Sequence, residues 1–112
     1  MPTPTYTALA TVTLGSSAAS VTFSSIPATY RDLILVANGT ITSSADDMRI
    51  YYNADTNNAN YSSVEMGGNG STTSSSTFLT AGVFSTDRAV VIVQIMDYSA
   101  TDKHKTLLSR TN

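Results

Sequence analysis

The stretch RAVVIVQIMDY, residues 88–98, decides the fold. It is the longest apolar run in the chain, and it is rich in Val and Ile, whose branched side chains pack well on a pleated sheet. A nearly continuous apolar run of this length is typical of a strand that is covered on both faces. The sequence therefore predicts a central β-strand over 88–98.

Other apolar runs extend this pattern along the chain. The stretch DLILVAN, residues 32–38, is also nearly continuous and predicts a second central strand, which ends at the turn Asn38-Gly39. Four shorter strands are predicted at 48–53, 61–66, 77–84 and 105–110. Between them lie a long polar loop at 53–60 and the Gly-, Ser- and Thr-rich stretch 67–76, which we expect to be a flexible surface loop.

The N-terminal part of the chain has the period of a half-buried strand. From 5 to 14, apolar residues alternate with Thr, and a second alternating stretch follows at 19–23. The Gly-Ser-Ser turn at 15–17 lies between them, so the sequence predicts a hairpin that ends before Pro27. Residues 1–5 are expected to form an extended N-terminal arm.

About eight short strands separated by turn signals, without a helical period or an internal repeat, indicate an all-β fold. We predict a single domain over 1–112, built as an antiparallel β-sandwich of jelly-roll type. A chain of this length supports one hydrophobic core.

Composition narrows the classes of partner. Charged residues are 12% of the chain, the net charge is −2, and the six basic residues are scattered, so we expect no nucleic-acid partner. The chain has no Cys, which excludes disulfides and thiolate metal sites. The N-terminus lacks the pattern of an export signal and no run is long enough to span a membrane as a helix, so we expect no membrane anchor.

Catalytic chemistry has few candidates. His104, the single His, lies in the charged stretch DKHK and is interpreted as a solvated turn residue. A Ser-His-Asp site could be built on it only if the fold brought the three residues together. Glu65 is the single Glu and has no evident carboxylate partner for glycoside cleavage. We therefore expect no catalytic site and no enzyme activity.

Metal and cofactor sites are equally sparse. Six oxygen-bearing residues could bind Ca²⁺, but they lack the spacing of an EF-hand and are explained more simply as turn residues: Asp46, Asp47, Asp55, Asn57, Asn58 and Asn60. Gly67, Gly68 and Gly70 are not followed by the Lys of a phosphate-binding loop. The glycosylation sequons at Asn38, Asn60 and Asn69 are expected by chance in so Ser- and Thr-rich a chain. We expect neither a metal nor a cofactor.

Three tyrosines flank the polar loop 53–60. Tyr51, Tyr52 and Tyr61 could together form a platform on which a sugar ring stacks. Alternatively, they are ordinary strand residues whose rings pack while their hydroxyls stay hydrated. The sequence leaves both interpretations open.

Three stretches carry a family resemblance: TVTLGSSAASVTFSSIPATYRDLILVANG (11–39), MRIYYNADTNNANYSSVEMGGNGS (48–71) and DYSATDKHKTLLSR (97–110). Together they resemble a family of small virion proteins of cyanophages and related tailed bacteriophages. Members of that family often continue past the LLSR strand. The resemblance therefore implies either a short member or a sandwich that neighbouring subunits complete.

The resemblance implies a structural role in the virion. We expect a capsid decoration or cement protein that stabilises the head shell and contacts the major capsid protein or other virion proteins. The alternatives are a tail-fibre or knob domain that contacts the host surface, or a carbohydrate-binding module. We expect synthesis in the host cytoplasm, assembly into the virion, and a homo-oligomer, with a trimer as the leading hypothesis.

Overall fold

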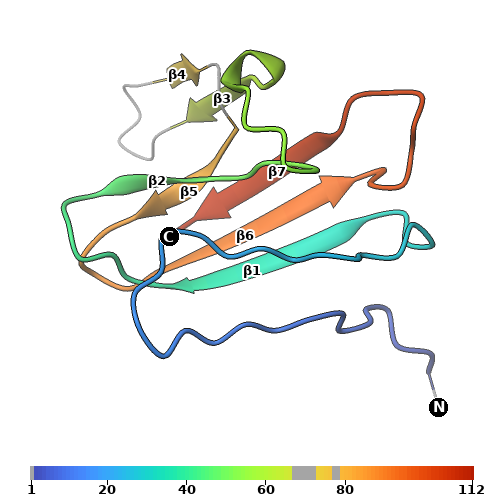
Figure 1. Cartoon of the computed structure of the whole chain (residues 1–112), viewed down its shortest axis with the longest axis horizontal. Coiled ribbons are helices and arrows are strands. Elements are labelled where there is room, and N and C mark those ends of the chain that lie inside the picture. Colours follow the sequence, from blue (N-terminus) through green and yellow to red (C-terminus); the bar gives the residue numbers. More distant parts are fainter. Residues whose placement is uncertain (1, 67–72, 77–78) are drawn as a thin grey trace.

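The computed structural model describes residues 2–66, 73–76 and 79–112, and within this part the chain is mostly β-structure (Figure 1). The predicted all-β class is confirmed, and the sheets are antiparallel. The regular elements are β1 (Leu33–Gly39), β2 (Asp46–Arg49), the short 3-10 helix η1 (Asn58–Asn60), β3 (Ser63–Met66), β4 (Thr73–Ser76), β5 (Thr80–Phe84), β6 (Ala89–Met96) and β7 (Thr106–Thr111).

Strand β6 is the centre of the largest sheet. The order of this three-stranded sheet is β1-β6-β7, and Val93 pairs with Leu35 on one side and with Ser109 on the other. Two smaller sheets pair β2 with β5 and β3 with β4. The prediction of a central strand over 88–98 is confirmed by the order β1-β6-β7, since β6 pairs with a strand on either side. The expectation that both its faces are covered is wrong, because Gln94 is exposed on the face opposite the core.

Strand β1 is correctly placed in the sequence but is not central. It lies at the edge of its sheet, and only its odd-numbered side chains Leu33, Leu35 and Ala37 pack against the core. On the opposite face Val36 is 61% exposed. The expectation that both faces of 32–38 are covered is wrong, because a continuous apolar run does not distinguish a buried central strand from an edge strand with one apolar face in solvent.

The core lies between the three-stranded sheet and the sheet formed by β2 and β5. Its buried residues are Ala81 from β5 and Val91, Val93 and Ile95 from β6. The spacing of two along β6 puts these three side chains on one face. Met48 and Phe84 pack against them from the β2–β5 sheet, so the core joins the two layers.

Gly82 marks the closest approach of the two layers. A Cβ placed at this position would lie 2.8 Å from Val91 Cγ2 and 2.9 Å from Val91 Cγ1, and it would also overlap the Thr111 hydroxyl. A side chain is therefore excluded where β5 crosses β6 and β7. The glycine lets the backbone of β5 pack directly on the buried face of β6.

Gly82→Ala should destabilise the protein, because overpacking a close contact typically costs about 1–3 kcal/mol of unfolding free energy. Gly39→Ala is the matched control, since a Cβ at Gly39 meets no atom within 4 Å. Urea denaturation of both variants checks the expectation. Equal midpoints for Gly82→Ala and Gly39→Ala would contradict the close packing of β5 on β6.

The predicted N-terminal hairpin is wrong. Residues 2–32 contain no strand, and Tyr6 is 73% exposed (Figure 1). The alternation of apolar residues and Thr specifies which side chains share a face, but a strand also needs a partner for its backbone hydrogen bonds. Within the described chain the segment 5–14 has no such partner.

The boundaries of three other elements also differ from the prediction. The strand expected at 48–53 is β2 at 46–49, because a register irregularity after Met48 and positive φ angles at Asn53 and Ala54 bend the chain. Of the loop expected at 67–76, residues 73–76 form β4, since Ser and Thr complete a ladder with β3 without apolar side chains. Residues 67–72, with Gly67, Gly68, Asn69 and Gly70, lie outside the described residues, as do 77–78 of the strand expected at 77–84.

Candidate functional site

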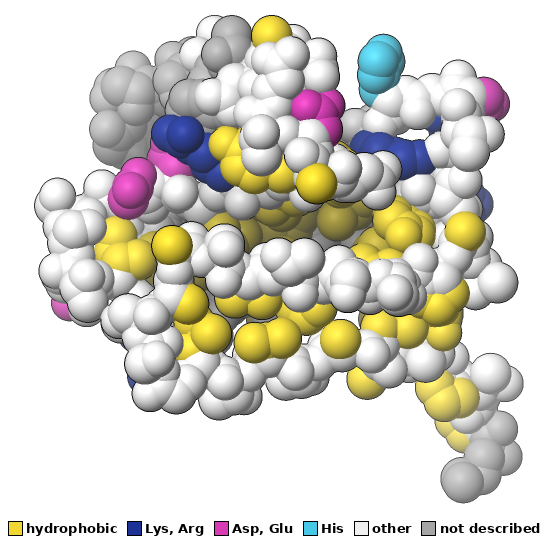
Figure 2. Space-filling view, in the orientation of Figure 1, with side chains coloured by type: hydrophobic (Ala, Val, Ile, Leu, Met, Phe, Trp, Pro, Cys, Tyr) yellow, Lys and Arg dark blue, Asp and Glu magenta, His cyan; other side chains and the backbone are white. Residues whose placement is uncertain are grey.

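Charged and hydrophobic side chains separate on the face drawn in Figure 2. Charged side chains gather in the upper half of the view, around β2, β3 and the connection from β6 to β7. Hydrophobic side chains gather in the lower half, over β1 and the segment that precedes it. On this face the charged side chains are therefore concentrated away from β1.

The three-stranded sheet also exposes an apolar face opposite the core. Cross-strand pairing places Gln94 between Ile34 and Leu108 on this face. It places Ile92 between Val36 and the charged Arg110. Leu108 is 65% exposed and Ile34 is 45% exposed. Large apolar side chains exposed together on one face of a sheet are typical of a protein–protein contact surface. We name the patch formed by Ile34, Val36, Ile92, Gln94 and Leu108, with Arg110 beside it on β7, the outer face.

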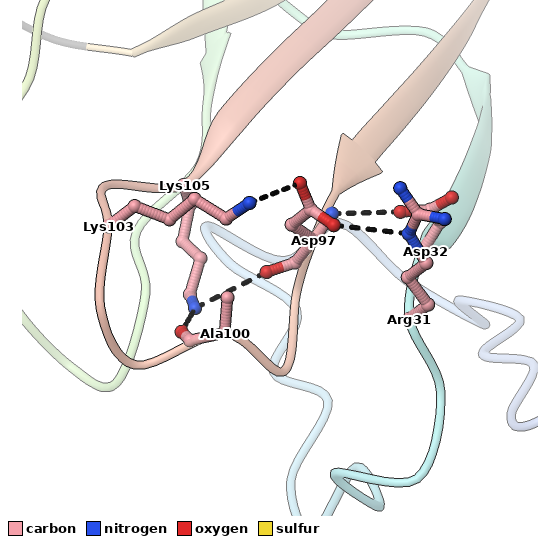
Figure 3. Close-up of polar contacts among 6 residues, drawn as sticks. All are labelled: Arg31, Asp32, Asp97, Ala100, Lys103 and Lys105. Carbon is pink, nitrogen blue, oxygen red and sulfur yellow. Dashed lines mark hydrogen bonds and ion pairs between the residues drawn. The ribbon is translucent and has the colours of Figure 1, made fainter.

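A cluster of polar contacts surrounds Asp97 at the end of β6 (Figure 3). Arg31 Nε lies 3.1 Å from Asp97 Oδ1, and Lys103 Nζ lies 2.8 Å from Asp97 Oδ2. The Asp97 backbone N–H donates to Asp32 Oδ1 over 2.8 Å. The side chain and the backbone N–H of Asp97 thus connect the end of β6 to Arg31 and Asp32, which precede β1.

Backbone and lysine contacts complete the Asp97 cluster. The Tyr98 N–H donates to the Arg31 carbonyl over 2.6 Å, and the Tyr98 hydroxyl donates to the Ile26 carbonyl over 3.1 Å. Lys105 Nζ donates to the carbonyl oxygens of Asp97 and Ala100 within the turn (Figure 3). The cluster holds the connection between β6 and β7 against the start of β1. We interpret the role of the cluster as structural, because the side chains of Arg31, Asp97 and Lys103 form ion pairs with one another.

The ion pairs shift the pKa values of both partners. Hydrogen bonds from Lys103 and then Arg31 lower the pKa of Asp97 below its ordinary value of 3.8. The hydrogen bond to Asp97 raises the pKa of Lys103 above its ordinary value of 10.5. The pairs therefore contribute stability from about pH 4 to pH 10. This contribution is lost as the pH falls through the lowered pKa of Asp97 or rises through the raised pKa of Lys103.

Asp97→Asn should reduce stability at pH 7, and this loss should shrink as the pH falls through the lowered pKa of Asp97. Asn accepts the positive φ of 50° at this position, so the backbone is preserved. Urea midpoints measured from pH 2 to pH 7 check this, with Asp87→Asn as the control for loss of an exposed carboxylate. If the urea midpoints of Asp97→Asn and the natural protein differ by the same amount at every pH in this range, the ion pairs do not account for the loss of stability.

The polar loop 53–60 is organised around Asp55. Its carboxylate accepts from the Asn57 N–H over 3.0 Å and from Asn60 Nδ2 over 2.7 Å. The Asn57 side chain in turn accepts from the Ala59 N–H and caps η1. The prediction of turn residues is therefore correct for this loop, because these oxygens accept from the loop's own N–H groups.

Tyr61 links the loop 53–60 to Tyr52, which follows β2 in the chain. Its hydroxyl donates to the Asp55 carbonyl over 2.7 Å and accepts from the Tyr52 N–H over 3.1 Å. Its ring stacks on Tyr52 with centroids 6.5 Å apart and meets the edge of Tyr51 at 5.7 Å. Burial raises the pKa of Tyr52 to about 12, and Tyr61 adds to this shift. Tyr52 and Tyr61 are therefore packing residues of the loop.

Only part of the expected sugar platform faces solvent. Of the three tyrosines, Tyr51 is the exposed one, at 38%, and its hydroxyl donates to Asn58 Oδ1. The structure does bring Tyr51, Tyr52 and Tyr61 together. However, the Tyr61 hydroxyl hydrogen-bonds to the backbone, and the rings of Tyr52 and Tyr61 stack on each other. A ligand could stack on the Tyr51 ring alone.

The remaining predicted site residues are dispersed. His104 is exposed in the connection between β6 and β7, Glu65 lies in β3, and Asn38 in β1 accepts from Arg88. Asp46 and Asp47 belong to β2, apart in the sequence from the Asp55 loop. Across 2–66, 73–76 and 79–112, no three His, Cys, Asp or Glu side chains lie close enough to hold a metal ion.

The Asp97 cluster and the outer face were not predicted from the sequence. The contact between Arg31 and Asp97 joins residues 66 positions apart, which no local pattern reveals. In the described part of the chain, no helix is long and apolar enough to cross a membrane. No protein-family model, curated protein or solved structure matches this chain.

Proposed function

We propose that the protein is a structural component of a bacteriophage virion, a decoration or cement protein that binds the head shell. The resemblance of residues 11–39, 48–71 and 97–110 to small phage virion proteins supports this role. The observation that carries it is the outer face, where Ile34, Val36 and Leu108 are large apolar side chains exposed on one side of a hydrogen-bonded sheet.

The outer face has the chemistry of a packing surface. Apart from Gln94 and Arg110, the side chains named on this face are apolar, and its strands place their side chains at fixed spacings. Burying such a face against a neighbouring protein removes apolar area from water, while the exposed Arg110, opposite Ile92 in β7, supplies a charged group beside the apolar side chains. The occupant in this proposal is the major capsid protein or another protein of the virion.

The proposed architecture is an antiparallel sandwich of jelly-roll type. The sheet β1-β6-β7 forms one layer, and the β2–β5 sheet, which packs across the core, belongs to the other. In this arrangement the core face is used for stability and the outer face for attachment. The protein is assembled into the virion through that attachment.

Leu108→Asp tests the proposed binding surface. The variant should fold, because Leu108 is 65% exposed, but it should bind purified head shells roughly tenfold or more weakly, since a charge would be buried against the shell. Thr101→Asp, in the exposed connection between β6 and β7, is the matched control and should bind normally. Equal binding by the two variants would contradict an outer-face interface.

A carbohydrate-binding role, as in a tail-fibre or knob domain, is the second candidate. The observation that favours it is the partly exposed ring of Tyr51 beside the hydrogen-bonded loop 53–60. On a glycan array we expect the purified protein to give no signal. A signal that is lost in Tyr51→Ala and kept in Tyr6→Ala would instead support this second candidate.

A further inference from the structure

The segment 5–14 has the pattern of a strand but no strand partner. Its apolar residues Tyr6, Val12 and Leu14 share one face of an extended chain, and each is about half exposed or more. In Figure 1 the chain before β1 runs without a strand from the N-terminus to the start of that sheet. The isolated chain therefore leaves a strand-forming segment in solvent.

The same structure has an open sheet edge. Strand β1 is the outer member of the order β1-β6-β7 and forms a ladder with β6 on one side. Its seven residues, LILVANG, include neither a charged residue nor Pro. Charged residues and Pro are the common protections against pairing at an edge, so β1 is suited to accept another strand.

Charge is compatible with contact between these two elements. Residues 1–30 contain no Asp, Glu, Lys or Arg, and the first charged side chain of the sequence is Arg31. Adding the segment 5–14 to β1 therefore removes no charged side chain of either element from water. The added strand gains backbone hydrogen bonds and places its apolar side chains beside those of β1.

We propose that residues 5–14 form an exchange arm, which adds as a strand to the open edge of β1 in a second copy of this chain. The proposal does not depend on a role in a virion. Reciprocal exchange closes the assembly, because each copy donates one arm and accepts one.

The chain between the arm and the fixed part of the fold is long enough for this exchange. The hydrogen bond from Tyr98 to the Ile26 carbonyl holds residue 26 beside the end of β6. Residues 15–25 are free of such a strand contact, and when extended they span up to roughly 36 Å at about 3.3 Å per residue. The whole molecule measures 41 × 34 × 29 Å. The arm can therefore reach β1 of an adjacent copy.

Cross-linking of single-cysteine variants tests the exchange, because the natural chain contains no Cys. Ala10→Cys and Thr11→Cys place a thiol on either face of the arm, and each is mixed with Val36→Cys and treated with a short bismaleimide. The reagent spans both directly opposite and diagonal neighbours of adjacent strands, about 5–8 Å apart. We expect a covalent heterodimer between Val36→Cys and at least one arm variant.

Two controls make the result decisive. Thr101→Cys mixed with Val36→Cys should give no heterodimer, and deletion of 2–14 should convert the assembly to a folded monomer in sedimentation velocity. A third sample is a single chain that carries an arm cysteine (Ala10→Cys or Thr11→Cys) together with Val36→Cys. If this chain cross-links within the monomer and the mixtures give no heterodimer, the arm lies on its own β1 and the proposal is overturned. All these measurements use the purified protein, so their failure leaves the Leu108→Asp test of shell binding unaffected.

Discussion

Replacing Val93 by Asp should produce the largest loss of stability among the substitutions described, about half or more of the free energy of unfolding. Val93 is fully buried at the centre of β6, between Leu35 and Ser109 in the ladder, and is part of the core cluster. A carboxylate there would be removed from water without a partner, at a cost of several kcal/mol. That is on the order of half or more of the 5–15 kcal/mol stability of a typical domain.

The contrast with neighbouring strand positions identifies the cause. Leu108→Asp, on the exposed outer face, should cost less than about 1 kcal/mol, as is usual for surface substitutions. Ile92→Asp should fall between the two, because Ile92 is half-buried and points away from the core. Circular dichroism melts of the three variants check this order, and a Val93→Asp midpoint equal to that of Leu108→Asp would show that β6 does not form the core.

Tyr61→Ala should produce the second-largest loss of stability. The substitution removes a ring that packs against Tyr51 and Tyr52 and a hydroxyl that makes two hydrogen bonds to the backbone. Truncation of a buried aromatic costs about 3–5 kcal/mol, and we expect roughly 2–3 kcal/mol here because Tyr61 is half-buried. The loop 53–60 should lose its order at the same time.

Tyr61→Phe separates the hydroxyl from the ring. It should cost about 1–2 kcal/mol, the usual effect of leaving buried polar partners without a hydrogen bond. Tyr51→Phe is the control, because the Tyr51 hydroxyl donates to the exposed Asn58 side chain and its loss should have little effect. Amide hydrogen exchange at 53–60 gives the local readout, and unchanged protection in Tyr61→Ala would contradict the role of Tyr61 in holding the loop.

The sequence predicted the strands that are held by their own hydrophobic pattern. Strands β6, β1 and β7 were found within a residue or two, because each has apolar side chains on one face that pack in or against the core. Whether a strand is central or at an edge depends on which strands flank it. The exposed face of β1 at Val36 therefore could not be predicted from the run 32–38.

Pairing explains the two opposite errors in the strand assignments. The segment 5–14 has an ideal strand pattern and forms none in the isolated chain, whereas the polar residues Thr73–Ser76 form β4. In both cases the outcome depends on whether a ladder partner is available, and β3 supplies one for β4. The exchange arm accounts for the first error, since its proposed partner lies in a second copy.

The candidate sites were predictable only where the residues are close in sequence. Tyr51, Tyr52 and Tyr61 flank one loop, and packing of their rings was one of the two interpretations that the sequence left open. The hydrogen bonds of the Tyr61 hydroxyl to the backbone were not predicted. The Asp97 cluster joins Arg31 to the far end of β6 and depends on the antiparallel pairing of β1 with β6. The outer face depends in the same way on the sheet order.

The most direct test of the proposed function is to purify the phage particles in which we propose the protein lies, establish whether they contain it, and reconstruct them. Our account predicts that the sheet β1-β6-β7 lies against the head shell, with Ile34, Val36 and Leu108 of the outer face buried in the contact. Purified particles that lack the protein would contradict the account. So would a reconstruction in which the protein is present while its outer face remains in solvent.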